Sequence, residues 1–344
     1  MRKSIRQRFG LIVLAIVLGI GAYYFRPTVI IDPIGDPGAH SNASVPNLEK
    51  YDFDSLRKEY LGQIRGSART ELEILGEINE VEERRKAGAQ GIAPVRFDTS
   101  EIRFQSDGKW VSGMINYFPE KSSLSPIIIM VRGYAEKEGY YPGSGSWKVA
   151  DELAMAGFAT ISLDFLGYGH SDVESNDMLE ARFHKVVEVL DLLEAVKQMP
   201  WVDQSKIGFW AHSNGGQIVM SVLEITGVSY PTVMWAPMTQ PFPDSVLSTI
   251  DKGSPVKEAL DDFMKHYDTR RYAFENYYHW INSPILIQQG TADDQVKVEW
   301  QRGVFGELGE LGKQVELEIY PGADHNLKGS WQEAVEKAII FFKR

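Results

Sequence analysis

Apolar residues follow one another without interruption from Pro126 to Val131, a pattern typical of a strand that is buried on both faces. Upstream, Glu101 to Phe104 and Trp110 to Phe118 alternate apolar and polar residues on either side of Ser106-Asp107-Gly108. That arrangement predicts a β-hairpin with a short turn. The change from an alternating to a continuous apolar pattern predicts an edge hairpin that gives way to buried parallel strands.

Strands and helices are then expected to alternate as far as the C-terminus. The predicted strands are Ala159 to Asp164, Ile207 to Ala211, Thr232 to Ala236, Pro284 to Gln289 and Val315 to Tyr320. The predicted helices are Met178 to Gln198, Gln217 to Ile225, Val298 to Leu311 and Trp331 to Phe342. Because strands joined by helices pair in parallel through right-handed crossovers, this order predicts an α/β protein with a mostly parallel, doubly wound sheet.

The first 25 residues predict a membrane anchor. Four basic residues between Arg2 and Arg8 precede an uncharged, mostly apolar run from Phe9 to Phe25. As a helix this run would span about 25 Å, against roughly 30 Å of hydrocarbon in a bilayer. The basic lead predicts a cytoplasmic N-terminus and a catalytic part outside the cytoplasm. A cleaved signal, which would make the protein secreted, and a buried core helix are the alternatives.

Two further regions precede the main domain. Residues 26–46 are rich in proline, glycine, asparagine and serine, which predicts an extended linker. Residues 47–95 combine charged residues with spaced leucine, isoleucine and tyrosine, which predicts helices. These helices would cover one edge of the main domain or form a face that binds a partner.

Composition narrows the range of partners. The chain has 344 residues, 43% of them hydrophobic, which is enough for one large core or two modest ones. Its net charge of −11 argues against a nucleic-acid partner, because such proteins concentrate lysine and arginine to neutralise phosphates. There is no cysteine, and the seven histidines show no metal-ligand spacing. Neither a metal nor another cofactor is therefore expected.

The predicted strand Ile207 to Ala211 stops just before Ser213, and Gly215 and Gly216 lead into the next predicted helix. This strand-to-helix corner resembles the nucleophile elbow of the α/β-hydrolases. That family has glycine two residues before and two residues after the serine, because strand and helix approach closely there. Gly215 matches the pattern, whereas Ala211 adds one methyl group. The resemblance implies that Ser213 is a nucleophile held clear of the sheet.

A serine hydroxyl needs a neighbouring base that is itself oriented by a carboxylate. Asp293 and Asp294 follow one predicted strand, and His325 follows the next one. The order Ser213, Asp293, His325, with each residue past the end of a strand, is the order of the α/β-hydrolase triad. Counted from the strand-ending Gly290, the acid of the family falls on Asp293, and Asp294 is the rival acid.

Three other polar residues near these motifs are assigned structural roles. Asp324 is interpreted as a surface charge beside the histidine, and His212 as a packing residue beside the serine. The segment from Asp164 to Asp172 resembles a tight turn of the family, in which the aspartate pins loops.

Attack on a carbonyl creates an oxyanion, which needs two preorganised N–H donors. The amide of Asn214, directly after the nucleophile, is the first candidate. Many relatives read His-Gly in the loop after the first parallel strand, where this chain reads Arg132-Gly133-Tyr134, and this match implies that the Tyr134 amide is the second donor. Each donor is worth on the order of 3 kcal/mol in the transition state. Arg132 either braces the loop or recognises an acidic group on the substrate.

The interval between Met238 and Asn282 breaks the alternation of strands and helices. It holds no convincing strand, only helical stretches that are rich in aromatic residues. Its place, after the strand that follows the elbow, resembles that of the α/β-hydrolase lid. Residues 238–282 are therefore interpreted as a lid insertion, with helix packing alone as the alternative.

Residues 96–344 resemble the catalytic domain of the prolyl-oligopeptidase and dienelactone-hydrolase group. The elbow and the segments Gly290 to Asp294 and Tyr320 to His325 carry this resemblance. It implies a serine hydrolase that cleaves ester or amide bonds in a small ester or a short peptide. The N-terminal region is too short for the β-propeller of oligopeptidases, which favours a carboxylesterase-like enzyme. A serine peptidase of the prolyl-oligopeptidase type and a non-catalytic binding protein on the same scaffold are the alternatives.

Overall fold

The computed structural model describes residues 47–62, 71–77, 97–119, 123–250 and 253–344. These residues all belong to one compact unit, Asp32–Arg344. The predicted anchor (1–25) and linker (26–46) lie outside the described residues. In the described part of the chain, every helix is too short or too polar to cross a membrane.

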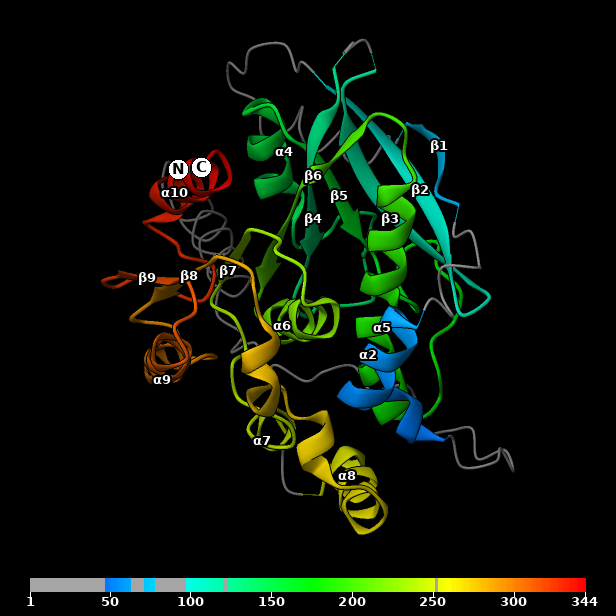
Figure 1. Cartoon of the computed structure of the whole chain (residues 1–344), viewed down its shortest axis with the longest axis vertical. Helices are drawn as coiled ribbons and strands as arrows, with labels where there is room; N and C mark the ends of the chain where they lie inside the picture. The colour runs from blue at the N-terminus through cyan, green and yellow to red at the C-terminus, as the bar shows by residue number, and fades with distance from the viewer. Residues whose placement is uncertain (1–46, 63–70, 78–96, 120–122, 251–252) are drawn as a thin grey trace, which may run out of the picture. The chain divides into compact units, whose positions relative to one another are not determined.

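One mixed sheet of nine strands forms the centre of the described residues, in the order β1-β2-β3-β5-β4-β6-β7-β8-β9 (Figure 1). The strands are β1 (Glu73–Glu77), β2 (Asp98–Ser106), β3 (Lys109–Tyr117), β4 (Ser125–Val131), β5 (Ala159–Leu163), β6 (Val202–His212), β7 (Thr232–Trp235), β8 (Ile285–Gly290) and β9 (Val315–Tyr320). The pairs from β1 to β5 are antiparallel, and all pairs from β5 to β9 are parallel. The predicted hairpin and the mostly parallel sheet are confirmed, but the hairpin does not form the edge, because β1 pairs with the outer side of β2.

Helices cover both faces of this sheet. They are α2 (Phe53–Leu61), α4 (Trp147–Met155), α5 (Met178–Lys197), α6 (Asn214–Thr226), α9 (Val298–Glu310) and α10 (Trp331–Phe342). Alternate residues of β4 separate two core layers: Ile127 and Ile129 pack in the layer of α2, α5 and α6, whereas Ile128 and Met130 pack in the layer of α4 and α10. Figure 1 shows these two sets of helices on opposite sides of the sheet. Helix α4 was not predicted.

The prediction of helices for residues 47–95 is wrong over Glu73–Glu77, which form the edge strand β1. This strand pairs antiparallel with β2, where Ile74 lies opposite Ile102, and an ion pair of 2.7 Å joins Arg103 to Glu73. The free backbone edge of β2 offers hydrogen bonds that a local sequence pattern cannot reveal, and tertiary context overrides helix propensity.

Helix α2 packs at the C-terminal end of α6 and caps it. The guanidinium of Arg57 in α2 donates to the carbonyl oxygens of Glu224 and Ile225 at 2.6 and 2.9 Å. The last carbonyls of a helix have no partner within the helix, so a cation placed there satisfies them and complements the helix dipole. Arg57 also lies over the ring of Trp280, 4.5 Å from its centroid. The described part of residues 47–95 is thus packed into the main domain.

The insertion between β7 and β8 is helical, as predicted. It contains α7 (Asp244–Leu247), α8 (Pro255–His266) and the 3-10 helices η3 (Thr269–Tyr272) and η4 (Phe274–Trp280). Its aromatic rings pack on one another and on α5: Phe242 lies 5.3 Å from Phe263 and 5.3 Å from Phe183, between ring centroids. Much of the aromatic content of the insertion is therefore buried against the body of the domain.

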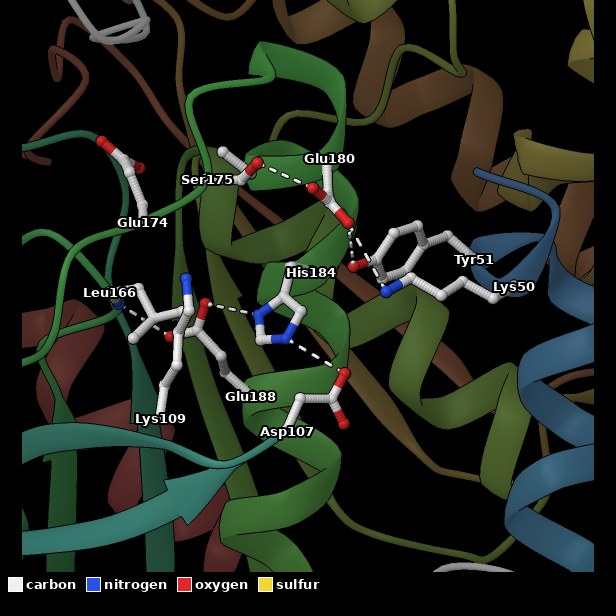
Figure 2. Close-up of a pocket in the computed structure, with 11 residues that line it drawn as sticks. Lys50, Tyr51, Asp107, Lys109, Leu166, Glu174, Ser175, Glu180, His184 and Glu188 are labelled. Carbon is white, nitrogen blue, oxygen red and sulfur yellow. Dashed lines mark hydrogen bonds and ion pairs between the residues drawn. The ribbon is translucent and has the colours of Figure 1, made fainter. Parts of the chain in front are cut away.

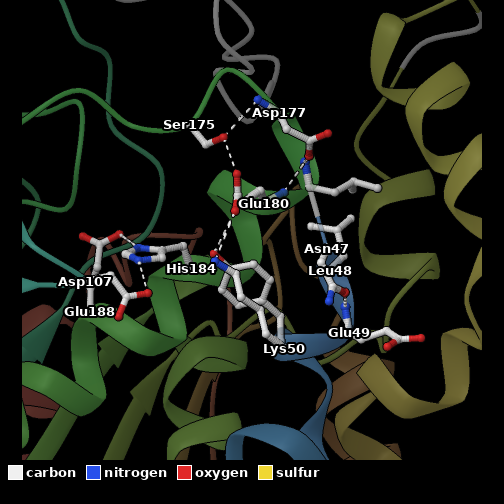
Figure 3. A network of polar contacts seen from close by, with 12 residues as sticks. Asn47, Leu48, Glu49, Lys50, Asp107, Ser175, Asp177, Glu180, His184 and Glu188 are labelled. Carbon is white, nitrogen blue, oxygen red and sulfur yellow. Dashed lines mark hydrogen bonds and ion pairs between the residues drawn. The ribbon is translucent and has the colours of Figure 1, made fainter. Parts of the chain in front are cut away.

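A polar cavity of about 270 Å³ lies where the 3-10 helix η1 (Leu48–Tyr51) meets α5 and the β2–β3 turn (Figure 2). His184 contacts Asp107 at 3.4 Å through Nε2 and Glu188 at 3.3 Å through Nδ1. Nearby, Glu180 accepts a hydrogen bond from Tyr51 and pairs with Lys50 (Figure 3). These groups partner one another, so the cavity lining serves to tie the N-terminal segment to the sheet.

This network makes the stability of the fold depend on pH. Burial opposes the charge of His184, but its bonds to Asp107 and Glu188 outweigh burial and raise its pKa to about 9. A histidine whose pKa is raised on folding stabilises the protein fully below the pKa of the unfolded chain and loses this effect as the pH rises through the folded value. Between about pH 6.5 and 9.5 the free energy of unfolding should fall by up to about 3 kcal/mol through this group. Urea unfolding at both pH values measures the fall.

The matched control is His184→Gln, which lacks the titrating ring. Its free energy of unfolding should change much less between the two pH values than that of the wild type. An equal change in both proteins would show that His184 is not the responsible group.

Candidate active site

Ser213 occupies a strained corner between β6 and α6. Its backbone has φ 52° and ψ −122°, a left-handed region that a residue with a side chain rarely adopts. Its N–H donates to the carbonyl of Trp235 at 3.0 Å, and its carbonyl accepts from Gly216 and Met238 at 2.9 and 2.8 Å. These bonds to the end of β7 and the next loop hold the strained conformation in place, so the predicted elbow geometry is present.

Two glycines allow α6 to approach the sheet at this corner. A Cβ atom on Gly215 would lie 2.1 Å from the carbonyl oxygen of Val131, and one on Gly216 would lie 2.3 Å from Cβ of Pro237. Both separations are far below van der Waals contact, so only glycine fits. Ala211, where the family pattern has glycine, is fully buried in the strand without such a requirement.

Asp293 and His325, from the loops after β8 and β9, form a buried pair. The distance from Nδ1 of His325 to Oδ2 of Asp293 is 2.9 Å. The other oxygen of Asp293 accepts from the amides of Gln295 and Val296, each at 2.9 Å. Burial would raise the pKa of Asp293, but the bonds from His325 and these donors outweigh burial and hold its pKa below the usual value. Asp293 therefore stays charged and holds the imidazole of His325 through Nδ1.

The two other acids near His325 in the sequence, Asp294 and Asp324, do not bond to its imidazole in the described residues. Asp294 is exposed, and the carboxylate that bonds His325 belongs to Asp293. Asp324 accepts from the amides of Asn326 and Lys328 at 3.0 and 2.9 Å, so it stabilises its own turn. Of the acids weighed from the sequence, the geometry selects Asp293 as the partner of the histidine.

His212 makes a contact with the His325 loop that the sequence did not predict. Its Nε2 lies 3.1 Å from the carbonyl oxygen of His325, and the two imidazole rings are 4.8 Å apart between centroids. Burial and the neighbouring His325 lower the pKa of His212 to about 4, so it is neutral near pH 7. A neutral ring can donate one hydrogen bond to this carbonyl. His212 thus links the elbow to the loop that carries His325, and its position next to the serine was the only signal in the sequence.

The segments expected to supply oxyanion donors flank Ser213. A Cβ atom on Gly133 would lie 2.7 Å from Cβ and 3.3 Å from Oγ of Ser213, so the loop after β4 passes directly over the serine. Tyr134 is the next residue in that loop. Asn214 is the first residue of α6, at the positive end of the helix dipole. Its side-chain oxygen accepts from Gln217.

Arg132 braces the loop after β4 from inside the protein. It is 4% exposed, and its guanidinium donates to the hydroxyl of Tyr140 at 3.1 Å and to the carbonyls of Gly133 and Asp164 at 2.8 and 2.5 Å. The group also lies 4.2 Å from the ring centroid of Tyr168. These contacts favour the bracing role over recognition of a substrate.

Asp164 completes this brace. Its buried carboxylate accepts from Tyr140, from the amide of Gly143 and from Ser112 at 2.9, 3.0 and 2.6 Å. Burial raises the pKa of Asp164, and these donors and Arg132 oppose the rise. The aspartate pins three segments together, which agrees with its predicted structural role.

A small cavity of about 50 Å³ has Asn214, the residue after Ser213, in its wall. Its walls come from α5, α6 and the insertion: Arg182, Phe183, Val186, Asn214, Gln217, Ile218, Ser221, Phe242, Tyr272 and Phe274. Aromatic and aliphatic side chains make up most of this lining, together with one arginine, two amides and one serine. Across the described residues, no three acidic or histidine side chains gather as metal ligands.

Solved structures with this fold include hydrolases of two kinds. Acetyl xylan esterase 1 from Thermoanaerobacterium sp. JW/SL YS485 is 15% identical with a TM-score of 0.59, and the match covers 88% of this chain and 100% of that chain. A puromycin-hydrolyzing peptidase of Mycobacterium tuberculosis is 14% identical with a TM-score of 0.60, over 74% of this chain and 40% of that one. These likenesses establish the α/β-hydrolase fold.

The matches to curated relatives cover only part of each relative. An uncharacterized 31.7 kDa protein of Escherichia coli is 28% identical over 103 residues, which are 30% of this chain and 34% of that protein. The uncharacterized peptidase YuxL of Bacillus subtilis is 24% identical over 241 residues, which are 66% of this chain and 35% of that protein. The match thus spans about a third of each of these relatives.

A family model described as the prolyl oligopeptidase family matches residues 147–344, which is more than half of the chain and includes Ser213, Asp293 and His325. The resemblance noted in the sequence is therefore confirmed, and it supports a serine hydrolase of ester or peptide bonds. The chain belongs to the prolyl oligopeptidase family.

Proposed function

We propose that this protein is a serine hydrolase that cleaves esters of short acyl groups through Ser213, His325 and Asp293. The observation that carries the proposal is the buried Asp293–His325 pair, bound at 2.9 Å and linked by His212 to the strained elbow that presents Ser213. A charged aspartate, an imidazole that it holds through Nδ1 and a serine on a sharp turn are the parts of an acyl-transfer site.

In the proposed reaction, Oγ of Ser213 attacks the ester carbonyl while Nε2 of His325 takes the hydroxyl proton. Asp293 stabilises the imidazolium that forms. The amides of Tyr134 and Asn214 hold the oxyanion of the tetrahedral intermediate. The imidazolium then protonates the leaving alcohol, and the acyl-enzyme that remains is hydrolysed by a water molecule through the same steps.

The preference for a short acyl group rests on the cavity at Asn214. Its volume of about 50 Å³ suits a group of a few atoms, since a single water needs roughly 10–15 Å³ on the same kind of measure. Phe242, Tyr272 and Phe274 of the insertion form part of its wall, which supports the interpretation of residues 238–282 as a lid. That the chain matches the whole length of an acetyl xylan esterase fits the same preference.

A serine peptidase is the second candidate. The family and relatives such as the dipeptidyl peptidase 4 of Sus scrofa, 27% identical over 223 residues, favour amide substrates. The triad and oxyanion donors would act in the same way on an amide. The two candidates differ in what enters the cavity and in the leaving group.

A turnover screen separates the candidates. The panel consists of p-nitrophenyl esters of increasing acyl length together with aminoacyl and dipeptidyl p-nitroanilides. We expect the largest kcat/KM for acetyl or propionyl esters and a steep fall with longer chains. Ser213→Ala should abolish turnover of every substrate. A clear preference for the anilides in kcat/KM would make the protein a peptidase, and activity that survives in Ser213→Ala would refute the mechanism.

We further propose that the N-terminal segment anchors the protein to a membrane, with the catalytic domain outside the cytoplasm. The support is the apolar run from Phe9 to Phe25 behind its basic lead. Full-length protein should stay with membranes after carbonate extraction, whereas a chain that begins at Ser41 should be released. Mature protein that lacks the first residues would favour a cleaved signal instead.

A further inference from the structure

A second cavity, of about 330 Å³, lies on the other side of the elbow from α6. Four tryptophans line it, Trp147, Trp210, Trp235 and Trp331, together with His212 and Asn326. Trp210 and Trp235 pack in the core layer of α4 and α10, whereas α6 and the small cavity at Asn214 belong to the opposite layer. This tryptophan cavity is therefore distinct from the proposed acyl cavity.

The tryptophan cavity adjoins the proposed active site. His212 directly precedes Ser213, and Asn326 directly follows His325. His212 also contacts the carbonyl of His325. A ligand in this cavity would lie against the loop that carries His325, on the side of the elbow away from α6.

Two buried hydrogen-bond donors in the cavity wall lack an acceptor. Trp210 and Trp235 are 1% and 3% exposed, and within the described residues neither indole N–H has a hydrogen-bond partner. An indole N–H is a donor only, and leaving a buried donor unpaired costs free energy. Both indole nitrogens are buried, so a ligand with oxygen acceptors pairs them only if the indole rings shift to expose them.

The surroundings of the cavity favour oxygen-rich ligands in a second way. Trp147 and Trp331 are the first residues of α4 and α10, so the N-termini of both helices lie at this cavity, and of their first amides that of Trp147 already donates to the carbonyl of Gly143 at 3.0 Å. The side chains of Ser146 and Ser330 do not cap these helices. Lys148 also lines the cavity, and none of the described lining residues is acidic. A cationic ligand would be repelled, and an acceptor-rich one would be stabilised.

We propose that the tryptophan cavity binds the pyranose ring of a saccharide. A pyranose offers flat C–H faces that can pack against indole rings and a rim of hydroxyl and ether oxygens that can accept from the N–H groups. A purely apolar ring would leave both indole donors unpaired, and a small inorganic anion would leave the aromatic walls unfilled. The volume suits a compact ligand, since small-molecule sites begin near 300 Å³. This binding does not depend on the proposed hydrolysis.

The test observes the indole N–H signals directly. The full chain is labelled with 15N-tryptophan, and the signals of Trp210 and Trp235 are assigned with Trp210→Phe and Trp235→Phe. Methyl β-D-glucopyranoside, methyl β-D-xylopyranoside and D-glucuronate are titrated separately. We expect saturable downfield shifts of both signals with at least one pyranose, and a stronger effect of glucuronate would add recognition of its carboxylate. Ser213→Ala should bind in the same way, so loss of activity does not affect the result.

Variants of the partly buried walls test the location. Trp331→Ala and Trp147→Ala should each weaken binding by at least about tenfold, which is about 1.4 kcal/mol. Trp300→Ala, which removes a partly exposed indole that does not line this cavity, should leave it unchanged. The proposal is overturned if no pyranose shifts the two signals, if benzoate shifts them and no pyranose does, or if the wall variants bind as well as the wild type.

Discussion

The left-handed backbone of Ser213 is the constraint on which the rest of the site depends. Such a conformation is costly for a residue with a side chain, and it persists only because β7, the next loop and the first turn of α6 bond to it. The same corner requires glycine at positions 215 and 216, where any Cβ atom would collide with the ends of β4 and β7. Strain at one residue is thus offset by the packing of a whole sheet, and the hydroxyl is held where two loops can reach it.

Buried charges fix those loops. Arg132 and Asp164 bond to backbone and hydroxyl groups and so hold the loop after β4, which passes over Ser213. Asp293, in the loop after β8, holds the imidazole of His325 in the loop after β9. Each of these charged groups has several partners, as burial demands. Several bonds therefore fix the position of the loop after β4 and of the Asp293 carboxylate. The insertion, whose aromatic rings pack against α5, supplies the wall on the side of the small cavity.

The sequence predicted the elements that have strong local patterns and missed those decided by distant contacts. Continuous apolar runs located β4 and β8, and the bounds of β9 and α10 were predicted to the residue. Strand β1 was misread because its partner is the edge of β2, whereas α4 was missed although Val149, Ala150, Leu153 and Ala154 give it a local apolar face. The count from Gly290 already favoured Asp293 over Asp294, and the fold agrees, since His325 contacts Asp293 and Asp294 is exposed. His212 was interpreted only as a packing residue, because its hydrogen-bond partner, the carbonyl of His325, is 113 residues away in the chain.

The proposed role of the Asp293–His325 pair is tested most directly by the turnover of two matched variants on the best ester substrate. Asp293→Asn should lower kcat by roughly 10⁴-fold, because an amide cannot stabilise the imidazolium and favours the wrong tautomer. Asp294→Asn, which makes the same change on the exposed neighbour, should leave kcat close to that of the wild type. Equal losses, or a larger loss in Asp294→Asn, would contradict the assignment of the acid.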